Sequence, residues 1–268
     1  MNIKTFGTSL VSVGRAYGSR NLAKTIQIYK EAGSTAVIWR AVSYFYRNGI
    51  RPILPDRSPV LWAGIIVDTR KIGDSLLSKF VYLEQLDDAP DYEQATVTAL
   101  KANVRRGETV VVVGGGRGIT ATIAAIEAGR QGHVNCFEGD LGSVKAVLRT
   151  GVLNGVRNRL KVDHAIVGKD VDVWGSSKSK EVISARNLPA CDVLELDCEG
   201  AELDLLRDMV ISPRVIIVET HGHLGSSTNE VHSILKHLGY NVIDLGWAEP
   251  GVQDFCIEKD IKVLVGTR

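Results

Sequence analysis

Beyond residue 108, short apolar segments alternate with amphipathic segments, and this alternation constrains the fold more than any other feature of the chain. The clearest apolar segment is Thr109–Val113, whose unbroken valines suit a strand that is buried on both faces of a sheet. Further apolar segments cover residues 133–137, 160–166, 191–196, 214–218, 240–245 and 261–265. Most are separated by helical periodicity, for which 93–104, 141–153 and 228–238 are the best examples. The pattern predicts an α/β domain with a parallel sheet covered by helices on both faces.

In such sheets, ligands bind beyond the carboxyl ends of the strands. A glycine-rich segment, GGGRG at 114–118, follows the first strand directly; its glycines are Gly114, Gly115, Gly116 and Gly118. A dinucleotide fingerprint has a third glycine, which falls here on Ile119 in one register and on Ala121 in the other. The observed spacing therefore favours a loop around a small zwitterion over one that cradles a pyrophosphate.

Glu138 follows the second predicted strand, 20 to 24 residues beyond these glycines. A carboxylate in this place can accept hydrogen bonds from both ribose hydroxyls of an adenosine. Adenosine-containing cofactors of both the sulfonium and the nicotinamide class use this device. Glu138 thus predicts nucleoside binding without choosing between the two classes.

Two polar motifs follow the fourth and fifth predicted strands. The first, LELDCEGAE at 194–202, places Asp197 and Glu199 at the expected cleft, although acids are also favoured simply because a helix begins there. The second, VETHGH at 218–223, contains His221, whose ordinary pKa near 6.5 suits a general base. The pair His221 and His223 beside Glu219 is a pattern that can bind a metal, but a solvated loop explains either histidine as well. No metal site is predicted from these residues.

Together the four motifs resemble the FkbM family of S-adenosylmethionine-dependent methyltransferases. The matching segments are VVVVGGGRGIT at 110–120, CFEGD at 136–140, DVLELDCEGAELDLL at 192–206 and IIVETHG at 216–222. The resemblance covers residues 91–268. It implies a class I methyltransferase fold, a Rossmann-like sheet of seven strands of which one is antiparallel. It also implies S-adenosylmethionine as the cofactor and methyl transfer to a hydroxyl oxygen of a sugar or another small metabolite.

The resemblance also suggests roles for individual residues. The glycine loop would let the methionine and ribose parts of the cofactor lie close to the backbone. Glu138 would bind the ribose, and His164 and Ala165 would flank the adenine. Asp197, Glu199 and His221 would face the acceptor, with either His221 or Asp197 as the base.

Two positions depart from the family pattern. Val112 stands where relatives have Asp, and Glu195 stands where they have Lys. The contact with the methionine amino group would then fall to Glu93 or to Asp197.

The N-terminal part of the chain differs in charge from the rest. Residues 1–57 hold nine Lys and Arg against two acids, whereas the remainder holds 23 basic and 29 acidic residues. We expect a mainly helical extension over 1–90 and the methyltransferase domain over 91–268. The basic segment 1–57 is either a solvated helix face or a contact for an acidic partner or an anionic membrane surface.

Composition narrows the setting. The four cysteines form no C-x-x-C pair, which favours a reducing cytoplasm, and no segment has the length and apolarity of a signal core or a membrane span. The formal net charge of +1 gives no general attraction for nucleic acid. The expected partner is a small hydroxyl-bearing molecule, and the oligomeric state stays open.

Two rival functions remain at this point. One is an NAD(P)-dependent oxidoreductase on a similar sheet, although no convincing catalytic set for hydride transfer is visible. The other is a non-catalytic module on the same fold that docks through residues 1–57 on a membrane or an acidic partner.

Overall fold

The computed structural model describes residues 59–67, 88–168 and 181–268, which all belong to one compact unit of the chain. Most of the extension predicted over residues 1–90 lies outside this range. The longer elements after residue 90 are α2 (Gln94–Asn103), β3 (Thr109–Val113), α3 (Ile119–Ala128), β4 (His133–Glu138), α4 (Leu141–Leu153), β5 (Leu160–His164), β8 (Val193–Leu196), α5 (Glu202–Asp208), β9 (Val215–Glu219), α6 (Thr228–His237), β10 (Asn241–Trp247), α7 (Gln253–Lys259) and β11 (Lys262–Thr267). Two short pairs of strands, β1 (Val60–Trp62) with β2 (Ile65–Val67) and β6 (Ile166–Val167) with β7 (Val182–Ile183), complete the strands of the described residues.

The central sheet has seven strands in the order β10-β11-β9-β8-β3-β4-β5. Neighbouring strands from β9 to β5 are parallel, and β11 pairs antiparallel with both β9 and β10. The order reverses between β3 and β8, because the chain starts at β3, builds outward to β5 and then crosses back to β8. This is the predicted class I methyltransferase arrangement, with one antiparallel strand near the carboxyl-terminal edge.

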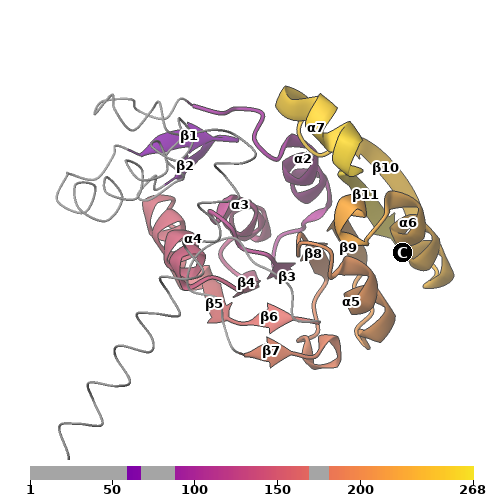
Figure 1. Ribbon diagram of the computed structural model, residues 1–268. Coiled ribbons are helices and arrows are strands. Elements are labelled where there is room, and N and C mark those ends of the chain that lie inside the picture. Colours follow the sequence, from indigo (N-terminus) through magenta and orange to yellow (C-terminus); the bar gives the residue numbers. More distant parts are fainter. Residues whose placement is uncertain (1–58, 68–87, 169–180) are drawn as a thin grey trace, which may run out of the picture. The chain divides into compact units, whose positions relative to one another are not determined.

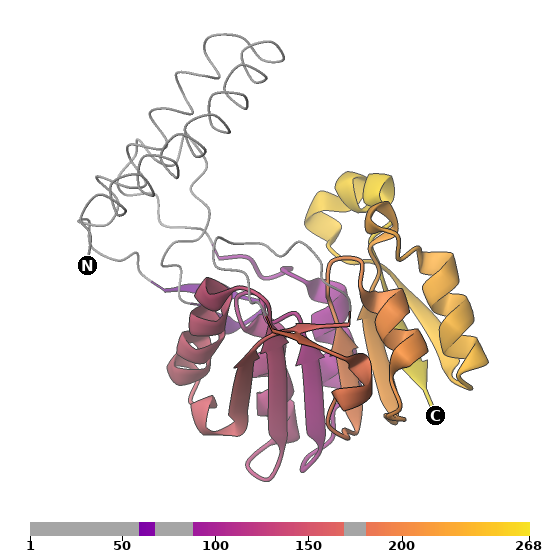
Figure 2. The same cartoon turned by 60° about the horizontal axis from the view of Figure 1, so that its bottom comes forward.

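Helices cover both faces of this sheet. Figure 1 shows α2, α3 and α4 on one side and α5 and α6 on the other, and Figure 2 shows the parallel strands side by side between them. The core on the α5 side is built from the apolar strand residues that alternate with those of the opposite face, such as Leu194 and Leu196. Because both faces are covered, the strands read as continuous apolar runs rather than as alternating patterns.

Local chemistry explains several of the boundaries. The side chain of Asp140 accepts a hydrogen bond from the Ser143 N–H and so caps α4, while Ser227 caps α6 through the Glu230 N–H. Such caps satisfy N–H groups that the first turn of a helix leaves without partners. Helix α4 has the predicted bounds, and α6 ends within one residue of its prediction.

The structure also contains elements that the sequence analysis did not expect. Prolines argue against regular structure over residues 49–62, yet Val60–Trp62 pairs with Ile65–Val67 in a hairpin. Its turn residues, Ala63 and Gly64, both have positive φ, as a tight hairpin turn requires. Helix α7 was missed as well. Within the described residues, no helix combines the length and apolarity that crossing a membrane requires.

Candidate active site

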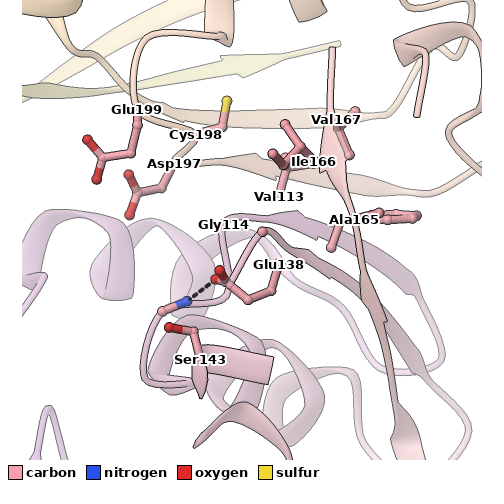
Figure 3. A pocket seen from close by; sticks show the side chains of 13 residues that line it. Val113, Gly114, Glu138, Ser143, Ala165, Ile166, Val167, Asp197, Cys198 and Glu199 are labelled. Atoms are coloured by element: carbon pink, nitrogen blue, oxygen red, sulfur yellow. Dashed lines mark hydrogen bonds between the residues drawn. The ribbon is translucent and has the colours of Figure 1, made fainter. Parts of the chain in front are cut away.

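A cleft opens where the carboxyl ends of β3, β4 and β8 meet, which is the edge that the α/β rule designates for ligands. It encloses about 610 Å³, its open mouth included. Figure 3 shows the carboxylates of Glu138 and Asp197 reaching it from two different strand ends, with Ala165, Ile166 and Val167 together on a further wall. The lining residues are Val113, Gly114, Gly116, Phe137, Glu138, Gly139, Ser143, Ala165, Ile166, Val167, Asp197, Cys198 and Glu199.

The glycine loop owes its shape to the absence of side chains. Gly114 has φ +98°, and a Cβ atom there would lie 1.7 Å from the backbone oxygen of Asp197. A Cβ atom on Gly118 would lie 2.7 Å from the Cα of Val147 in α4. Gly116 differs, because a Cβ atom there would meet nothing within 4 Å. Two of these glycines therefore permit close backbone packing, while Gly116 borders the open space of the cleft.

Glu138 fixes the loop through its carboxylate. One oxygen, Oε2, accepts hydrogen bonds from the N–H groups of Gly115 and Gly116 at 2.8 Å each, and Oε1 accepts one from the Asp140 N–H at 2.7 Å. Burial raises the pKa of Glu138, while these three N–H groups act in the opposite direction. A carboxylate offers about four acceptor positions, so one remains for a ligand hydroxyl.

The wall opposite the acids is apolar. Ala165, Ile166 and Val167 are all buried and lie beyond the end of β5. His164 is the last residue of β5, and its Nε2 lies 3.1 Å from the carbonyl oxygen of Gly139. His164 therefore contacts the turn that borders the cleft and is not itself among the lining residues, whereas Ala165 is.

Behind the cleft, Asp197, His221 and Glu202 form a chain of side chains that connects β8, β9 and α5. His221 Nε2 lies 3.5 Å from Asp197 Oδ1, and His221 Nδ1 lies 2.8 Å from Glu202 Oε1. Glu202 is fully buried, and its Oε1 also accepts hydrogen bonds from the N–H groups of Cys198 and Gly200. Because Glu202 occupies Nδ1, the imidazole presents Nε2 toward Asp197.

The charges of this chain shift all three pKa values. Burial lowers the pKa of His221, but the hydrogen bond with Glu202 and the charge of Asp197 outweigh it and raise the value to about 9. Burial raises the pKa of Asp197 to about 6, against the opposing effect of His221. Burial also acts to raise the pKa of Glu202, but the contact with His221 prevails and lowers it.

Three more carboxyls crowd the same region. Glu195 is fully buried on β8, and neither of its oxygens has a hydrogen-bond partner among the described residues. Glu219 ends β9, and its Oε2 accepts a hydrogen bond of 3.4 Å from Thr96 Oγ1 of α2. Burial raises the pKa of both groups well above the usual range, and burial with the nearby Asp197 raises the pKa of Glu93 to about 8.

The two departures from the family pattern turn out to be neighbours. Val112 of β3 and Glu195 of β8 are register partners in adjacent parallel strands, and both are fully buried. What the sequence presents as two separate substitutions, 83 positions apart, is one pair in the sheet.

The structure brings most of the predicted site residues together. Gly114, Gly116, Glu138, Ala165, Asp197 and Glu199 line the cleft. Gly115 and Gly118 support the loop, His221 stands behind Asp197, and Glu93 precedes α2 with its N–H donating to Glu249 Oε1. His223 lies exposed in its loop. Sequence reasoning missed Glu202 as the partner of His221, since acids at a helix start have a simpler explanation.

A family model described as "Methyltransferase FkbM domain" matches residues 169–242. This match confirms the resemblance to the FkbM family. The matched range contains the LDCEGAE segment at 196–202 and the histidine loop, VETHGH at 218–223. These two segments form the acidic side of the site, which holds Asp197, Glu202 and His221. The FkbM match supports methyltransferase activity and implies S-adenosylmethionine as the cofactor. A search of curated proteins found no match.

Solved structures of methyltransferases resemble the chain at low identity. The ribosomal protein L11 methylase of Lactobacillus delbrueckii subsp. bulgaricus has a TM-score of 0.46 at 13% identity, over 74% of this chain and 90% of that one. An S-adenosylmethionine-dependent O-methyltransferase of Thermotoga maritima has a TM-score of 0.44 at 15% identity, over 73% and 71%. Aeropyrum pernix fibrillarin, solved with bound S-adenosyl-L-methionine, has a TM-score of 0.43 at 11% identity, over 65% and 74%.

The cleft fits the FkbM cofactor in three respects. Gly116 leaves open space where a side chain would project, Glu138 retains an acceptor position for a ribose hydroxyl, and the apolar wall suits an adenine ring. The carboxylate of Asp197 adds a partner for a positive charge at the other side. The fit rests on the geometry of these residues and not on the family match.

Proposed function

We propose that the protein transfers a methyl group from S-adenosylmethionine to a hydroxyl oxygen of a sugar or another small metabolite. The observation that carries this proposal is the placement of Asp197, whose carboxylate reaches the cleft while His221 and Glu202 stand behind it. A hydroxyl must lose its proton as it is methylated, so a hydroxyl acceptor requires a proton acceptor at this place.

Different residues of the cleft contact different parts of the cofactor. S-adenosylmethionine supplies the methyl group on a positively charged sulfur. Glu138 accepts a hydrogen bond from the ribose, Ala165 and its two apolar neighbours contact the adenine, and Gly114 and Gly116 allow the methionine part to lie against the backbone.

Asp197 and His221 act as a pair on the acceptor side. As the acceptor oxygen bonds to the methyl carbon, the carbon–sulfur bond breaks with its electron pair left on sulfur, and the hydroxyl proton passes to Asp197. His221 does not line the cleft, so we assign it a positioning role: it orients the carboxylate and is itself oriented by Glu202. Glu199 lies beside Asp197 on the same wall and faces the acceptor.

Labelled cofactor tests the proposal directly. S-adenosylmethionine that carries a ¹³C-methyl group is incubated with the protein and a panel of sugars, phenols and amines, and NMR reports whether the transferred carbon is bonded to oxygen or nitrogen. We expect oxygen-bound label, lost by at least 100-fold in Asp197→Asn and kept in Glu258→Gln, an exposed carboxyl on α7. Label on nitrogen, or full activity of Asp197→Asn, would contradict the proposal.

Calorimetry separates this function from the nicotinamide alternative. S-adenosylhomocysteine should bind, and NAD(H) should not, because the loop spacing and the FkbM match favour the sulfonium cofactor. Binding of NAD(H) without S-adenosylhomocysteine would instead support an oxidoreductase.

We further propose a cytoplasmic protein whose basic residues 1–57 contact an anionic membrane surface. The support is the charge of that segment, nine Lys and Arg against two acids. Sedimentation with vesicles rich in phosphatidylserine should retain the full chain at low salt and release it at high salt. Absence of sedimentation at low salt would leave the segment a solvated or packing surface.

A further inference from the structure

Beside Asp197 and His221, which the proposed transfer uses, lies one further carboxyl, that of Glu219. One ligand atom each from Asp197, Glu219 and His221 lies within 4.8 Å of the others. We propose that these three side chains bind a divalent cation of the kind that accepts mixed oxygen and nitrogen ligands, with Mn²⁺ as its probe. Ligand atoms on opposite sides of an ion that binds oxygen lie about 4 to 5 Å apart and adjacent ones about 3 to 4 Å apart, so the three groups are near enough to reach one ion after a small approach.

The sheet explains why the donors meet. Asp197 follows β8 directly and Glu219 ends β9, and the register of these parallel strands continues from Leu196 and Val218 to this pair. Glu219 and His221 are two positions apart at the end of β9, which favours one face for both. The three ligands thus come from two adjacent chain segments.

The imidazole of His221 is held in a fixed orientation by the carboxylate behind it. Glu202 holds His221 Nδ1 at 2.8 Å, and Nε2 lies 3.5 Å from Asp197 Oδ1, so a bound cation would take the place of a proton between them. His221 is only 5% exposed. A buried carboxylate that fixes one imidazole nitrogen so that the other faces the metal is the usual outer-shell arrangement for metal-binding histidines.

An independent observation is a further buried carboxyl, two residues before Asp197, without a hydrogen-bond partner within the described ranges. Glu195 lies two residues before Asp197 on β8, is fully buried, and has no hydrogen bond to either oxygen from the described residues. No Lys or Arg in the described part of the chain forms an ion pair with Glu195 or Glu219. Buried carboxyls are normally paired or coordinate metals, and a cation beside Asp197 would compensate this group as well.

Such a cation would also define the acceptor more closely. Asp197 lines the cleft, so an ion held by it turns its remaining coordination positions toward the acceptor. This step rests on the proposed function: the acceptor would be a molecule with an oxygen donor that reaches the ion, and its hydroxyl would ionise more readily there.

Calorimetry and electron paramagnetic resonance with MnCl₂ on the full chain, after treatment with EDTA, test the site. We expect one Mn²⁺ per chain, at least 100-fold weaker binding in Glu219→Gln and in His221→Ala, and 10- to 100-fold weaker binding in Glu202→Gln. The matched control, Glu258→Gln, removes an exposed carboxyl on α7 and should bind Mn²⁺ like the natural protein. Each variant is first shown to unfold cooperatively in a thermal melt.

S-adenosylhomocysteine binding in EDTA keeps this inference separate from the proposed function. If the protein binds the nucleoside but no Mn²⁺, the cation site is wrong and the methyltransferase proposal stands. If Mn²⁺ binds equally well to Glu219→Gln and His221→Ala, the ion sits elsewhere and the assignment is likewise overturned. If neither ligand binds to cooperatively folded protein, both proposals fail.

Discussion

At the β4 side of the cleft, the carboxylate of Glu138 accepts hydrogen bonds from three backbone N–H groups. At the β8 side, Glu195 is more deeply buried than Glu138 and has no hydrogen-bond partner among the described residues. Glu138 and Glu195 are both glutamates of the same domain, and their strands, β4 and β8, have only β3 between them in the sheet.

The two sides of the cleft differ in how their buried negative charge is compensated. The charge of Glu138 is compensated by the N–H dipoles of Gly115, Gly116 and Asp140, and one acceptor position is left for a cofactor. The β8 side holds Glu195, Asp197 and Glu219 with little positive charge from the described residues other than His221. Burying a charge without a partner is costly, so compensation there must come from protonation or from a bound cation.

The largest effect is expected where the two sides touch, at Gly114. Gly114→Ala places a Cβ atom 1.7 Å from the Asp197 oxygen in a backbone of φ +98°, so both strand ends must move apart. Strain and overpacking together should lower the free energy of unfolding by about 2–5 kcal/mol in urea titrations. The control, Gly116→Ala, meets nothing within 4 Å and should cost only about 1–2 kcal/mol for its positive φ. Equal losses in the two variants would show that the contact with Asp197 is not what constrains the loop.

The next two predictions replace the buried glutamate on each side of the cleft, and the expected changes in the free energy of unfolding have opposite signs. Glu138→Gln keeps the shape of the side chain but leaves one oxygen to accept from three N–H groups. Its NH₂ group then points at an N–H donor instead of an acceptor. Loss of charge-assisted hydrogen bonds should lower the free energy of unfolding by about 1.5–3 kcal/mol. Calorimetry should show weaker S-adenosylhomocysteine binding, by about tenfold or more. Unchanged stability would mean that the three N–H contacts are not the main support of the loop.

At the other side, Glu195→Met should act in the opposite direction. The substitution replaces two buried oxygens without partners by an apolar chain of similar length among Val112 and Ile217. Removing that desolvation penalty should raise the free energy of unfolding by about 1–3 kcal/mol, measured by urea titration in EDTA. A loss of stability would reveal a partner for Glu195 and would remove the contrast between the two sides.

The sequence was sufficient for those features that depend on neighbouring residues. The valines of 109–113 predict the central strand, and the spacing of the glycine loop and Glu138 predicts that the two meet, because they follow adjacent parallel strands. The pattern did not reveal the hairpin of β1 and β2, since prolines precede it, nor α7, whose Phe255 and Ile257 remain exposed and give little periodicity.

The acidic side could not be predicted in the same way. The contact of Glu202 with His221 depends on how α5 and the end of β9 approach each other, and no spacing in the sequence encodes that approach. The pairing of Val112 with Glu195 likewise depends on the register of β3 and β8. Predicting such contacts requires the strand order, which local patterns do not determine.

The smallest effect is expected at His223, the second histidine of the loop. His221 and His223 are the same residue type, so the difference between their substitutions reports the effect of their surroundings. His223 is exposed, and its ring contacts the Lys259 carbonyl oxygen at 3.2 Å. His223→Ala should change the free energy of unfolding by less than about 0.5 kcal/mol and leave methyl transfer unchanged. His221→Ala leaves the fully buried Glu202 without its imidazole and should cost about 1–3 kcal/mol. Urea titrations and the labelled-methyl assay of both variants measure this; equal effects would show that burial beside Glu202 does not distinguish the two residues.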